Sequence, residues 1–304
     1  MMNKVTVLGS LNVDTILKIA RLPKPGETMQ MESKQNAGGG KGANQAIAAA
    51  RCKAQTSFIG KVGNDANGAM MLELLKEAEI DTDAITYSEL GTGQAFILLQ
   101  TSGENSILVY GGANQDVQLD DVKRATAKIQ ASDFLITQFE TPLAGGQLAF
   151  EIAKQAGVKT ILNPAPAKEV SQQMLALTDL ITPNETEAQA LTGIEVKDEK
   201  SCRQAATKLQ ELGVKNVIIT LGSKGAFYQT TTDYGFVPAF KVKAVDTTAA
   251  GDTFLGSLSS QLKPDFTNIE AAIRFANRAS SLAVQRLGAI PSIPSYEEIV
   301  AANK

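Results

Sequence analysis

The chain has 304 residues, with 29 Lys and Arg against 32 Asp and Glu and a formal net charge of −3. Its length suffices for a large core in one α/β unit, and the lack of a basic excess gives no support for binding to nucleic acid or to an anionic membrane. The absence of histidine excludes Ser-His-Asp hydrolysis, Cys-His catalysis and His-ligated zinc, so a general base can only be Asp, Glu, Lys, Tyr or Cys.

Short apolar runs rich in Val, Ile and Phe recur along the chain between longer stretches with helical patterning. The runs are Val5–Gly9, Thr56–Gly60, Asp133–Thr137, Lys159–Asn163, Asp179–Thr182 and Asn216–Leu221. Runs without polar alternation are typical of strands covered on both faces. The helical stretches include Gly68–Glu79, Leu143–Ala156 and Cys202–Leu212. This alternation predicts an α/β fold with a doubly wound, mostly parallel sheet and helices on both faces. Gly157 and Gly213 follow the last two helical stretches and are expected as left-handed caps.

Two regions interrupt this rhythm and predict a small β-sheet lid on a single α/β domain of residues 1–304. They lie at about residues 11–36 and 92–112, and the second contains strand-like Gln94–Gln100 and Ser106–Tyr110 around a Ser-Gly-Glu-Asn turn. We expect the two regions to come together over the carboxyl edge of the sheet, where open α/β sheets bind ligands. An ordinary edge hairpin is the alternative.

Targeting and cysteine patterns indicate a soluble cytoplasmic protein. The N-terminal stretch enters strand-like sequence at once, without the features of a secretory signal, and no apolar run reaches membrane-spanning length. Cys52 and Cys202 stand apart, outside any CxxC spacing, so neither a disulfide nor a zinc site is expected.

The segment Val245–Phe254 carries the strongest chemical signal in the chain. Small residues at the start of the predicted helix Gly251–Leu262 leave backbone amides uncovered, and these amides and the helix dipole favour an anion such as a phosphoryl group in transfer. Asp252 stands in the first turn, where its carboxylate can accept the proton of an attacking hydroxyl. An Asp at this position is more often a simple helix cap, but a cap does not require the preceding Ala249, Ala250 and Gly251.

These residues also carry a family resemblance, because Asp246–Phe254 is similar to the C-terminal signature of the ribokinase-like carbohydrate kinases, also called the PfkB family. Gly38–Ala46 resembles the N-terminal signature of the same family. Similar segments along the rest of the chain are Gly9–Asp14, Asn163–Ala167, Thr182–Glu187, Thr220–Gly225 and Pro291–Pro294. The resemblance covers essentially the whole chain and implies a ribokinase-like fold, with catalysis by Asp252 and by the amides of Ala249, Ala250 and Gly251.

The resemblance places the sugar at the first strand and the N-terminal signature. The residues implied in substrate binding are Asn12, Asp14, Gly40, Lys41, Gly42, Asn44, Glu140 and Asp252. The glycines before Lys41 could instead suggest a nucleotide P-loop. However, a P-loop has Ser or Thr after its lysine, and here Gly42 follows, so we expect the nucleotide elsewhere.

ATP, Mg²⁺ and an activating K⁺ are the further ligands that the resemblance implies. Its ATP-binding positions are Asn184, Glu187, Thr220, Gly222, Ser223, Lys224, Gly225, Gly251 and Asn277. Glu187 would hold Mg²⁺ through water, although an Asn-x-x-Glu pattern alone is more often a helix capping box. The K⁺ positions are Asp246, Thr248, Ala283, Arg286, Gly288 and Ser292.

The implied activity is ATP-dependent phosphorylation of the 5-hydroxyl of D-ribose, in an enzyme that forms a homodimer through exposed edges of the lid. Kinases for fructose, deoxyribose, adenosine or a keto-deoxy sugar acid are alternatives within the family. An acidic sugar would favour additional Arg or Lys near Asn12, where only Lys41 occurs. A non-catalytic sugar-binding regulatory protein is the alternative of another class, and the retained Asp252 argues against it.

Overall fold

A nine-stranded sheet forms the centre of the protein, for which a computed structural model describes residues 2–302. In spatial order its strands are β13 (Tyr234–Pro238), β12 (Gly225–Gln229), β11 (Asn216–Thr220), β10 (Leu180–Ile181), β9 (Lys159–Leu162), β8 (Phe134–Thr137), β1 (Lys4–Leu8), β4 (Gln55–Gly63) and β5 (Asp81–Ser88). Neighbours from β5 to β11 pair in parallel, whereas β12 pairs antiparallel with both β11 and β13. The predicted mostly parallel α/β sheet is therefore confirmed.

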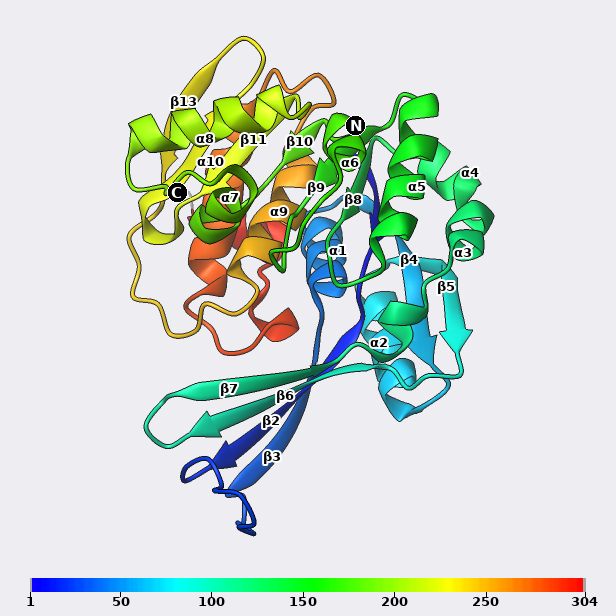
Figure 1. The fold of residues 1–304 in the computed structure, drawn as a ribbon, viewed down its shortest axis with the longest axis vertical. Coiled ribbons are helices and arrows are strands. Elements are labelled where there is room, and N and C mark those ends of the chain that lie inside the picture. Colours follow the sequence, from blue (N-terminus) through cyan, green and yellow to red (C-terminus); the bar gives the residue numbers. More distant parts are fainter. Residues whose placement is uncertain (1, 303–304) are drawn as a thin grey trace.

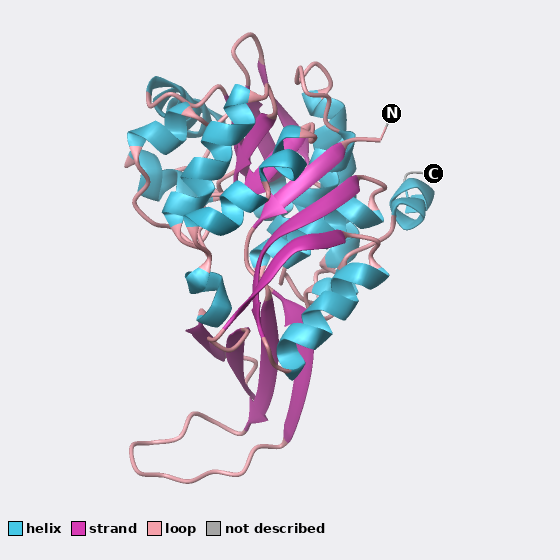
Figure 2. Cartoon of the chain, turned by 90° about the vertical axis from the view of Figure 1, so that its right-hand side faces the viewer, coloured by secondary structure: helices cyan, strands magenta, loops and turns pink. Residues whose placement is uncertain are grey.

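Helices cover both faces of this sheet (Figure 2). One face packs against α1 (Lys41–Arg51), α2 (Ala66–Glu77), α9 (Ala250–Gln261) and α10 (Ile269–Ala283). The other packs against α3 (Leu119–Arg124), α4 (Thr126–Gln130), α5 (Leu143–Gln155), α6 (Gln172–Ala176), α7 (Glu185–Thr192) and α8 (Glu199–Glu211). The last helix, α11 (Tyr296–Ala302), packs on α10 through Ile299. Among residues 2–302 no helix has both the length and the apolar composition required to cross a bilayer.

The central strands are apolar throughout because successive side chains enter opposite cores. Val7 packs against the α1 and α9 face, and the next residue, Leu8, packs against the α5 face. Ile218 and Ile219 on β11 divide in the same way. A strand with one solvated face would alternate with polar residues, so the continuous apolar runs report burial on both sides.

Left-handed glycines end α5 and α8, as the sequence indicates. Gly157 has φ 78° and Gly213 has φ 111°, a conformation that glycine adopts without a steric penalty.

A second sheet joins two segments that are far apart in the sequence. It consists of β3 (Ser33–Gly39), β2 (Asn12–Ile19), β6 (Gly93–Gln100) and β7 (Asn105–Tyr110), in that order. The central pair β2 and β6 is parallel, and both outer pairs are antiparallel. Figure 1 shows this sheet projecting from one end of the main body. A short 3-10 helix, η1 (Gly112–Asp116), returns the chain from β7 to the main body.

The strand order reverses beside β1, and this reversal determines where a ligand site can form. The chain passes from β1 to β4 and β5 on one side, and later to β8, β9, β10 and β11 on the other. The connections after β1 and β8 therefore leave the sheet in opposite directions and open a crevice at their carboxyl ends. Ligands of open α/β sheets bind at this kind of switch point.

Candidate active site

The N-terminus of α9 reaches this crevice and carries Asp252 in its first turn. Asp252 is 7% exposed, and Ala249 before the helix adopts a left-handed conformation with φ 58°. The Ala250 amide donates to the Thr247 carbonyl at 3.2 Å, whereas no acceptor within residues 2–302 is found for the amides of Gly251 and Asp252. A Cβ built on Gly251 would meet no atom within 4 Å. The Ala249 amide also has no acceptor among the residues that the structure describes, so of the amides predicted for the anion site only that of Ala250 is already paired.

Two amide side chains of α1 hold the Asp252 carboxylate. Asn44 Nδ2 donates to Oδ2 at 3.0 Å, and Gln45 Nε2 donates to Oδ1 at 2.8 Å. The other amide atom of Asn44, Oδ1, is buried without a partner among the described residues. Because buried polar atoms are normally satisfied, this oxygen is suited to accept a hydrogen bond from a bound ligand.

Two of the residues predicted to bind the sugar, Asn12 and Asp14, lie on strand β2 of the second sheet. Asn12 Oδ1 accepts a hydrogen bond from Asn114 Nδ2 at 2.7 Å, which fixes the Asn12 amide. Asp14 lies against Gly39, where a Cβ would come within 2.4 Å of Asp14 Oδ2. Gly39 therefore leaves the room that the Asp14 carboxylate occupies.

Glu140 and glycine contacts set the start of α1 beside these groups. Glu140 Oε2 accepts from the Lys41 amide at 3.0 Å and from Ser10 Oγ at 2.5 Å. Gly42 packs on the backbone after β1, since a Cβ there would lie 2.6 Å from the Ser10 nitrogen, and Gly40 has φ 92°. A single carboxylate thus accepts a hydrogen bond from the first amide of α1 and lies beside the other residues predicted to bind the sugar.

Four carboxyl groups and one lysine make the site electronegative. Burial, and then the Glu140 and Asp252 carboxylates, raise the pKa of Asp14 from 3.8 to about 6. Coulombic attraction to Asp252 is the main cause that raises the pKa of Lys41. Burial raises the pKa of Glu187, the fourth carboxyl group. The arrangement favours a neutral polar ligand beside Asp14 and Glu140.

A cavity of about 730 Å³ opens on the other side of Lys41 and Asp252. Its lining includes most of the residues predicted for ATP: Asn184, Glu187, Thr220, Gly222, Ser223, Gly225, Gly251 and Asn277. Lys224 is exposed and does not line it. The size suits a ligand of nucleotide dimensions.

Asn184 and Glu187 form the capping box of α7 and border the cavity as well. Asn184 Oδ1 accepts from the Glu187 amide at 2.8 Å, and Glu187 Oε2 accepts from the Asn184 amide at 3.0 Å. Asn184 also bridges to Thr220 at the end of β11. Asn184 and Glu187 therefore do cap α7, and the same arrangement places the Glu187 carboxylate at the cavity wall.

The cavity is also lined by apolar residues that the sequence analysis did not single out. Phe240 and Val242 from the loop after β13 line it, together with Val284 after α10. Asn277 donates from Nδ2 to the carbonyls of Val237 and Pro238, each at 3.1 Å, and so holds the end of β13 from which this loop begins. These residues could not be predicted because apolar residues in a loop give no periodic sequence pattern.

Three of the residues predicted for K⁺, Asp246, Thr248 and Gly288, are joined by hydrogen bonds. Asp246 Oδ1 accepts from Thr248 N at 2.9 Å and from Thr248 Oγ1 at 2.6 Å, while Asp246 Oδ2 accepts from Gly288 N at 2.9 Å. The Ala283 carbonyl accepts from Arg286 N, and Ser292 Oγ donates to the Ala289 carbonyl. None of the predicted K⁺ residues lines the large cavity.

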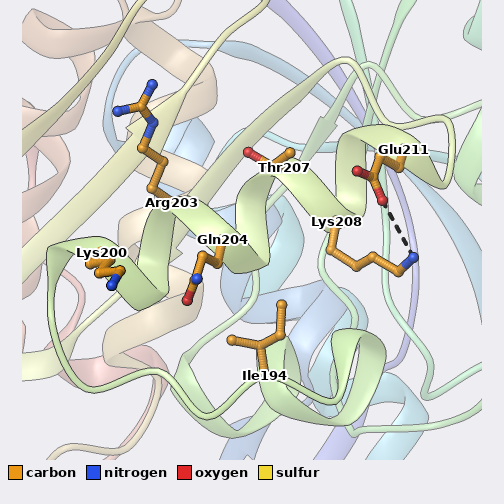
Figure 3. Close-up of a pocket in the computed structure, with 7 residues that line it drawn as sticks. All are labelled: Ile194, Lys200, Arg203, Gln204, Thr207, Lys208 and Glu211. Carbon is orange, nitrogen blue, oxygen red and sulfur yellow. Dashed lines mark hydrogen bonds and ion pairs between the residues drawn. The ribbon is translucent and has the colours of Figure 1, made fainter.

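A second hollow, of about 510 Å³, lies on the outer surface of α8, away from these groups (Figure 3). Its polar side chains are exposed, and Lys208 forms an ion pair with Glu211 at 3.3 Å. It contains none of the predicted site residues.

A buried carboxylate at a helix N-terminus, between a polar site and a nucleotide-sized cavity, defines the class of phosphotransferases that act on hydroxyl groups. Residues 2–296 match the model described as pfkB family carbohydrate kinase, and the chain belongs to this family.

Similar proteins agree with this membership over nearly the full chain. A "Ribokinase" of Staphylococcus aureus is 49% identical over 301 residues, covering 98% of this chain and 99% of the relative. A "Bifunctional ribokinase/ribose-5-phosphate isomerase A" of Fructilactobacillus sanfranciscensis is 50% identical over 98% of this chain, which spans 56% of that protein. The solved structure of an Arabidopsis thaliana ribokinase with ribose and ATP has a TM-score of 0.93 and 34% identity, covering 100% of this chain and 99% of that one.

Proposed function

We propose that the protein transfers the γ-phosphoryl group of ATP to the 5-hydroxyl of D-ribose, giving ribose 5-phosphate and ADP. The observation that carries this proposal is the position of Asp252, held by Asn44 and Gln45 between the polar site and the large cavity. The relatives named ribokinase and the Arabidopsis structure with ribose and ATP support the choice of substrates.

In this mechanism Asp252 accepts the proton of the 5-hydroxyl as its oxygen attacks the γ-phosphorus. The bond from phosphorus to the bridging oxygen breaks, and its electron pair leaves with ADP. The free amides of Gly251 and Asp252 stabilise the charge on the transferred group. Lys41 lies at the boundary of the two sites and supplies a positive charge there.

The charge of the sugar side supports a neutral substrate. Asp14 and Glu140 repel a carboxylate or phosphate substituent, and an ionised carboxylate accepts hydrogen bonds from sugar hydroxyls. The unpartnered Asn44 Oδ1 adds another acceptor. These groups support a neutral polyol over a sugar acid.

The donor atoms present fit the two implied cations. Glu187 combines a buried carboxylate with the cavity wall, and would hold Mg²⁺ through water, with Asn184 near the phosphates. When bound, Mg²⁺ neutralises charge on the donor phosphates. For K⁺, the oxygens of Asp246, Thr248 and the segment 283–292 form a set of hard donors joined by the Asp246–Gly288 bond.

We further propose that residues 1–304 form one folding unit in which the second sheet, from segments of about 11–36 and 92–112, is a lid. Its outer strand β7 carries exposed Ile107, Leu108 and Val109, which supports a homodimer formed through the lids. A cytoplasmic location agrees with the use of ATP.

A coupled ADP-release assay with ribose, 2-deoxyribose, fructose and adenosine tests this function. We expect the highest kcat/KM with ribose, and a kcat lower by roughly a hundredfold or more for Asp252→Asn, the scale for loss of a general base. A higher kcat/KM with another substrate would contradict the sugar assignment, and no ADP release with any sugar would favour the non-catalytic alternative. Equal rates in sodium and potassium buffers would remove the K⁺ proposal.

A further inference from the structure

A chain of two buried glutamines ends on the carboxylate of Asp252. Gln45 of α1 is 0% exposed, and its Nε2 donates to Asp252 Oδ1 at 2.8 Å and to Asn163 Oδ1 at 3.1 Å. Gln45 Oε1 in turn accepts from Gln138 Nε2 at 2.6 Å. Gln138 follows β8 directly and is 2% exposed. Neither glutamine can therefore reach solvent, and Gln45 does not line the nucleotide cavity.

The direction of this chain is set by the carboxylate. An ionised carboxylate only accepts hydrogen bonds, so Gln45 must present its NH₂ group to Asp252 and its oxygen to Gln138. Gln138 must then present its own NH₂ group to Gln45. Its remaining oxygen, Oε1, is left buried and without a partner in the described part of the chain. A reversed Gln138 would bring two oxygens together, so the unpaired atom is a consequence of the order that Asp252 imposes.

The backbone is arranged to accommodate the second glutamine. A Cβ on Gly9 would lie 2.3 Å from Gln138 Oε1, so only glycine after β1 leaves space for this side chain. Gly9 follows β1 and Gln138 follows β8, the two strands at the switch point. The ends of these strands therefore help to align the Asp252 carboxylate on α9.

Gln45 differs in role from Asn44, the other donor to Asp252. Asn44 has an unpaired oxygen that a ligand could use, so its amide is only partly satisfied within the protein. The Gln45 amide is fully used within the protein, by Asp252, Asn163 and Gln138. It therefore provides the fixed point that keeps the Asp252 carboxylate from rotating about its own side chain.

We propose that Gln45, itself fixed by Gln138, is the positioning residue that orients the Asp252 carboxylate toward the acceptor hydroxyl. This inference rests on the proposed role of Asp252 as base. A misplaced base slows the proton transfer, whereas the binding of sugar and ATP depends on other groups. The loss of Gln45 should therefore appear in kcat and leave KM largely unchanged.

The first test replaces Gln45 by Met, which has a similar length and no amide. We expect kcat to fall by about 10- to 100-fold, the scale for small misplacement of a catalytic group, with small changes in KM for ribose and ATP. In the Asp252→Asn background the same substitution should cause no further loss, because the partner that it orients is already gone. An equal additional loss in that background would overturn the proposal.

Gln45→Glu gives a readout that a structural role would not produce. Ionised, the new carboxylate faces Asp252 and repels it, while its protonated form can again donate a hydrogen bond. We expect the ratio of kcat of this variant to kcat of the native enzyme to increase as the pH is lowered. A pH profile parallel to that of the native enzyme would contradict the inference.

Further variants keep the test valid if Gln45→Met folds poorly. Gln138→Glu removes the donor to Gln45 and favours a reversed Gln45 amide, so kcat should fall although residue 138 does not touch Asp252. Asn216→Leu is the matched control, since Asn216 is a buried amide that donates to the Asp179 carbonyl at 2.8 Å at the opposite end of the sheet. It should lower stability and leave kcat unchanged.

The two levels of proposal fail in different ways. If Asp252→Asn keeps full activity, Asp252 is not the base and the proposed mechanism fails. If Asp252→Asn is impaired while both Gln45→Met and Gln138→Glu keep the native kcat, only the positioning role fails.

Discussion

The site around Asp252, called here the junction because it lies between the polar site and the large cavity, differs from the lid sheet in its burial. The side chains of the junction are buried and hydrogen-bonded within one chain, whereas the lid exposes apolar side chains. At the junction, Asp252 is 7% exposed and both of its oxygens accept hydrogen bonds from α1. On the lid, Val109 and Leu108 of β7 are 67% and 62% exposed. One region is organised before any ligand arrives, and the other leaves apolar surface uncovered.

This difference indicates a division of work between the two regions. A preorganised junction favours the transition state, because the groups that stabilise charge need not rearrange during the reaction. A partly uncovered lid can respond to the sugar or to a second chain. Asp14 belongs to both regions, since it lies on lid strand β2 and its pKa is raised in part by Asp252.

Gly251→Ala should give the largest effect on the junction. A Cβ at residue 251 meets no atom of the protein within 4 Å, so the fold should keep its stability. The methyl group would, however, project into the space beside the free amides and obstruct the phosphoryl group. We expect kcat to fall by about a hundredfold or more, the scale for losing an oxyanion-type contact, with an unchanged melting temperature.

Gly256→Ala is the matched contrast on the same helix. Its Cβ would lie 2.3 Å from the Gln45 carbonyl oxygen and 2.5 Å from Ala48 Cβ, so this change should lower the melting temperature. If Gly251→Ala instead destabilised the protein as Gly256→Ala does, the open space at residue 251 would not be a ligand site.

Much of the junction could be predicted from the sequence, because its signals are local. The small residues before Asp252 and the Asn184–Glu187 spacing lie within a few positions of one another. The hydrogen bonds of Gln45 could not be predicted in this way, because its partners are distant in the sequence. Gln45 lies 207 positions from Asp252 and 93 positions from Gln138. Only the fold brings them together. A buried Gln in an otherwise Ala-rich helix is the one sequence signal that could have indicated them.

The fold shows the same limit. Most strands with both faces buried gave continuous apolar runs and were predicted, whereas the edge strands β5 and β13 carry polar or exposed residues and were not. The buried strand β12 was not predicted either, because its short run Gly225–Gln229 begins in a glycine-containing turn. An edge strand is covered incompletely, so its composition resembles that of a loop.

Asp14→Asn should produce the next largest effect, because it should weaken ribose binding and increase the stability of the empty protein. Loss of a charged acceptor should raise KM for ribose by roughly 10- to 100-fold, from the usual strength of hydrogen bonds to charged groups. Because folding raises the pKa of Asp14 from 3.8 to about 6, its charge destabilises the empty protein above pH 6. Asn should therefore raise the melting temperature at pH 7.5.

The pH dependence of that gain identifies its cause. Below the ordinary pKa of 3.8 Asp14 is protonated in both the folded and the unfolded chain, so the gain in melting temperature should vanish there. A gain that stayed constant with pH would assign the effect to packing against Gly39 instead.

Ribose affinity of the native protein should weaken at acidic pH by a smaller amount. With a pKa of about 6, the ionised fraction of Asp14 falls about five- to sixfold between pH 6 and pH 5, and the dissociation constant for ribose should rise by up to that factor. Calorimetric titration without ATP measures this. The Asp14→Asn variant should give a nearly flat profile, and an equally steep one would exclude Asp14 as the cause.

The smallest effect on catalysis is expected from the lid surface, where Val109→Asp places a charge on exposed strand β7. If two lids pair, burying this charge without a partner is unfavourable, and sedimentation should show dissociation to monomers. Asp252 and its partners are untouched, so kcat should stay near native and only KM for ribose should increase modestly. Val300→Asp on α11 is the control, because this valine is also exposed but lies outside the lid. If the native protein is already monomeric, the exposed β7 surface does not form a dimer and its role is limited to closure over a ligand. If the dissociated variant loses kcat, the catalytic site around Asp252 requires the second chain.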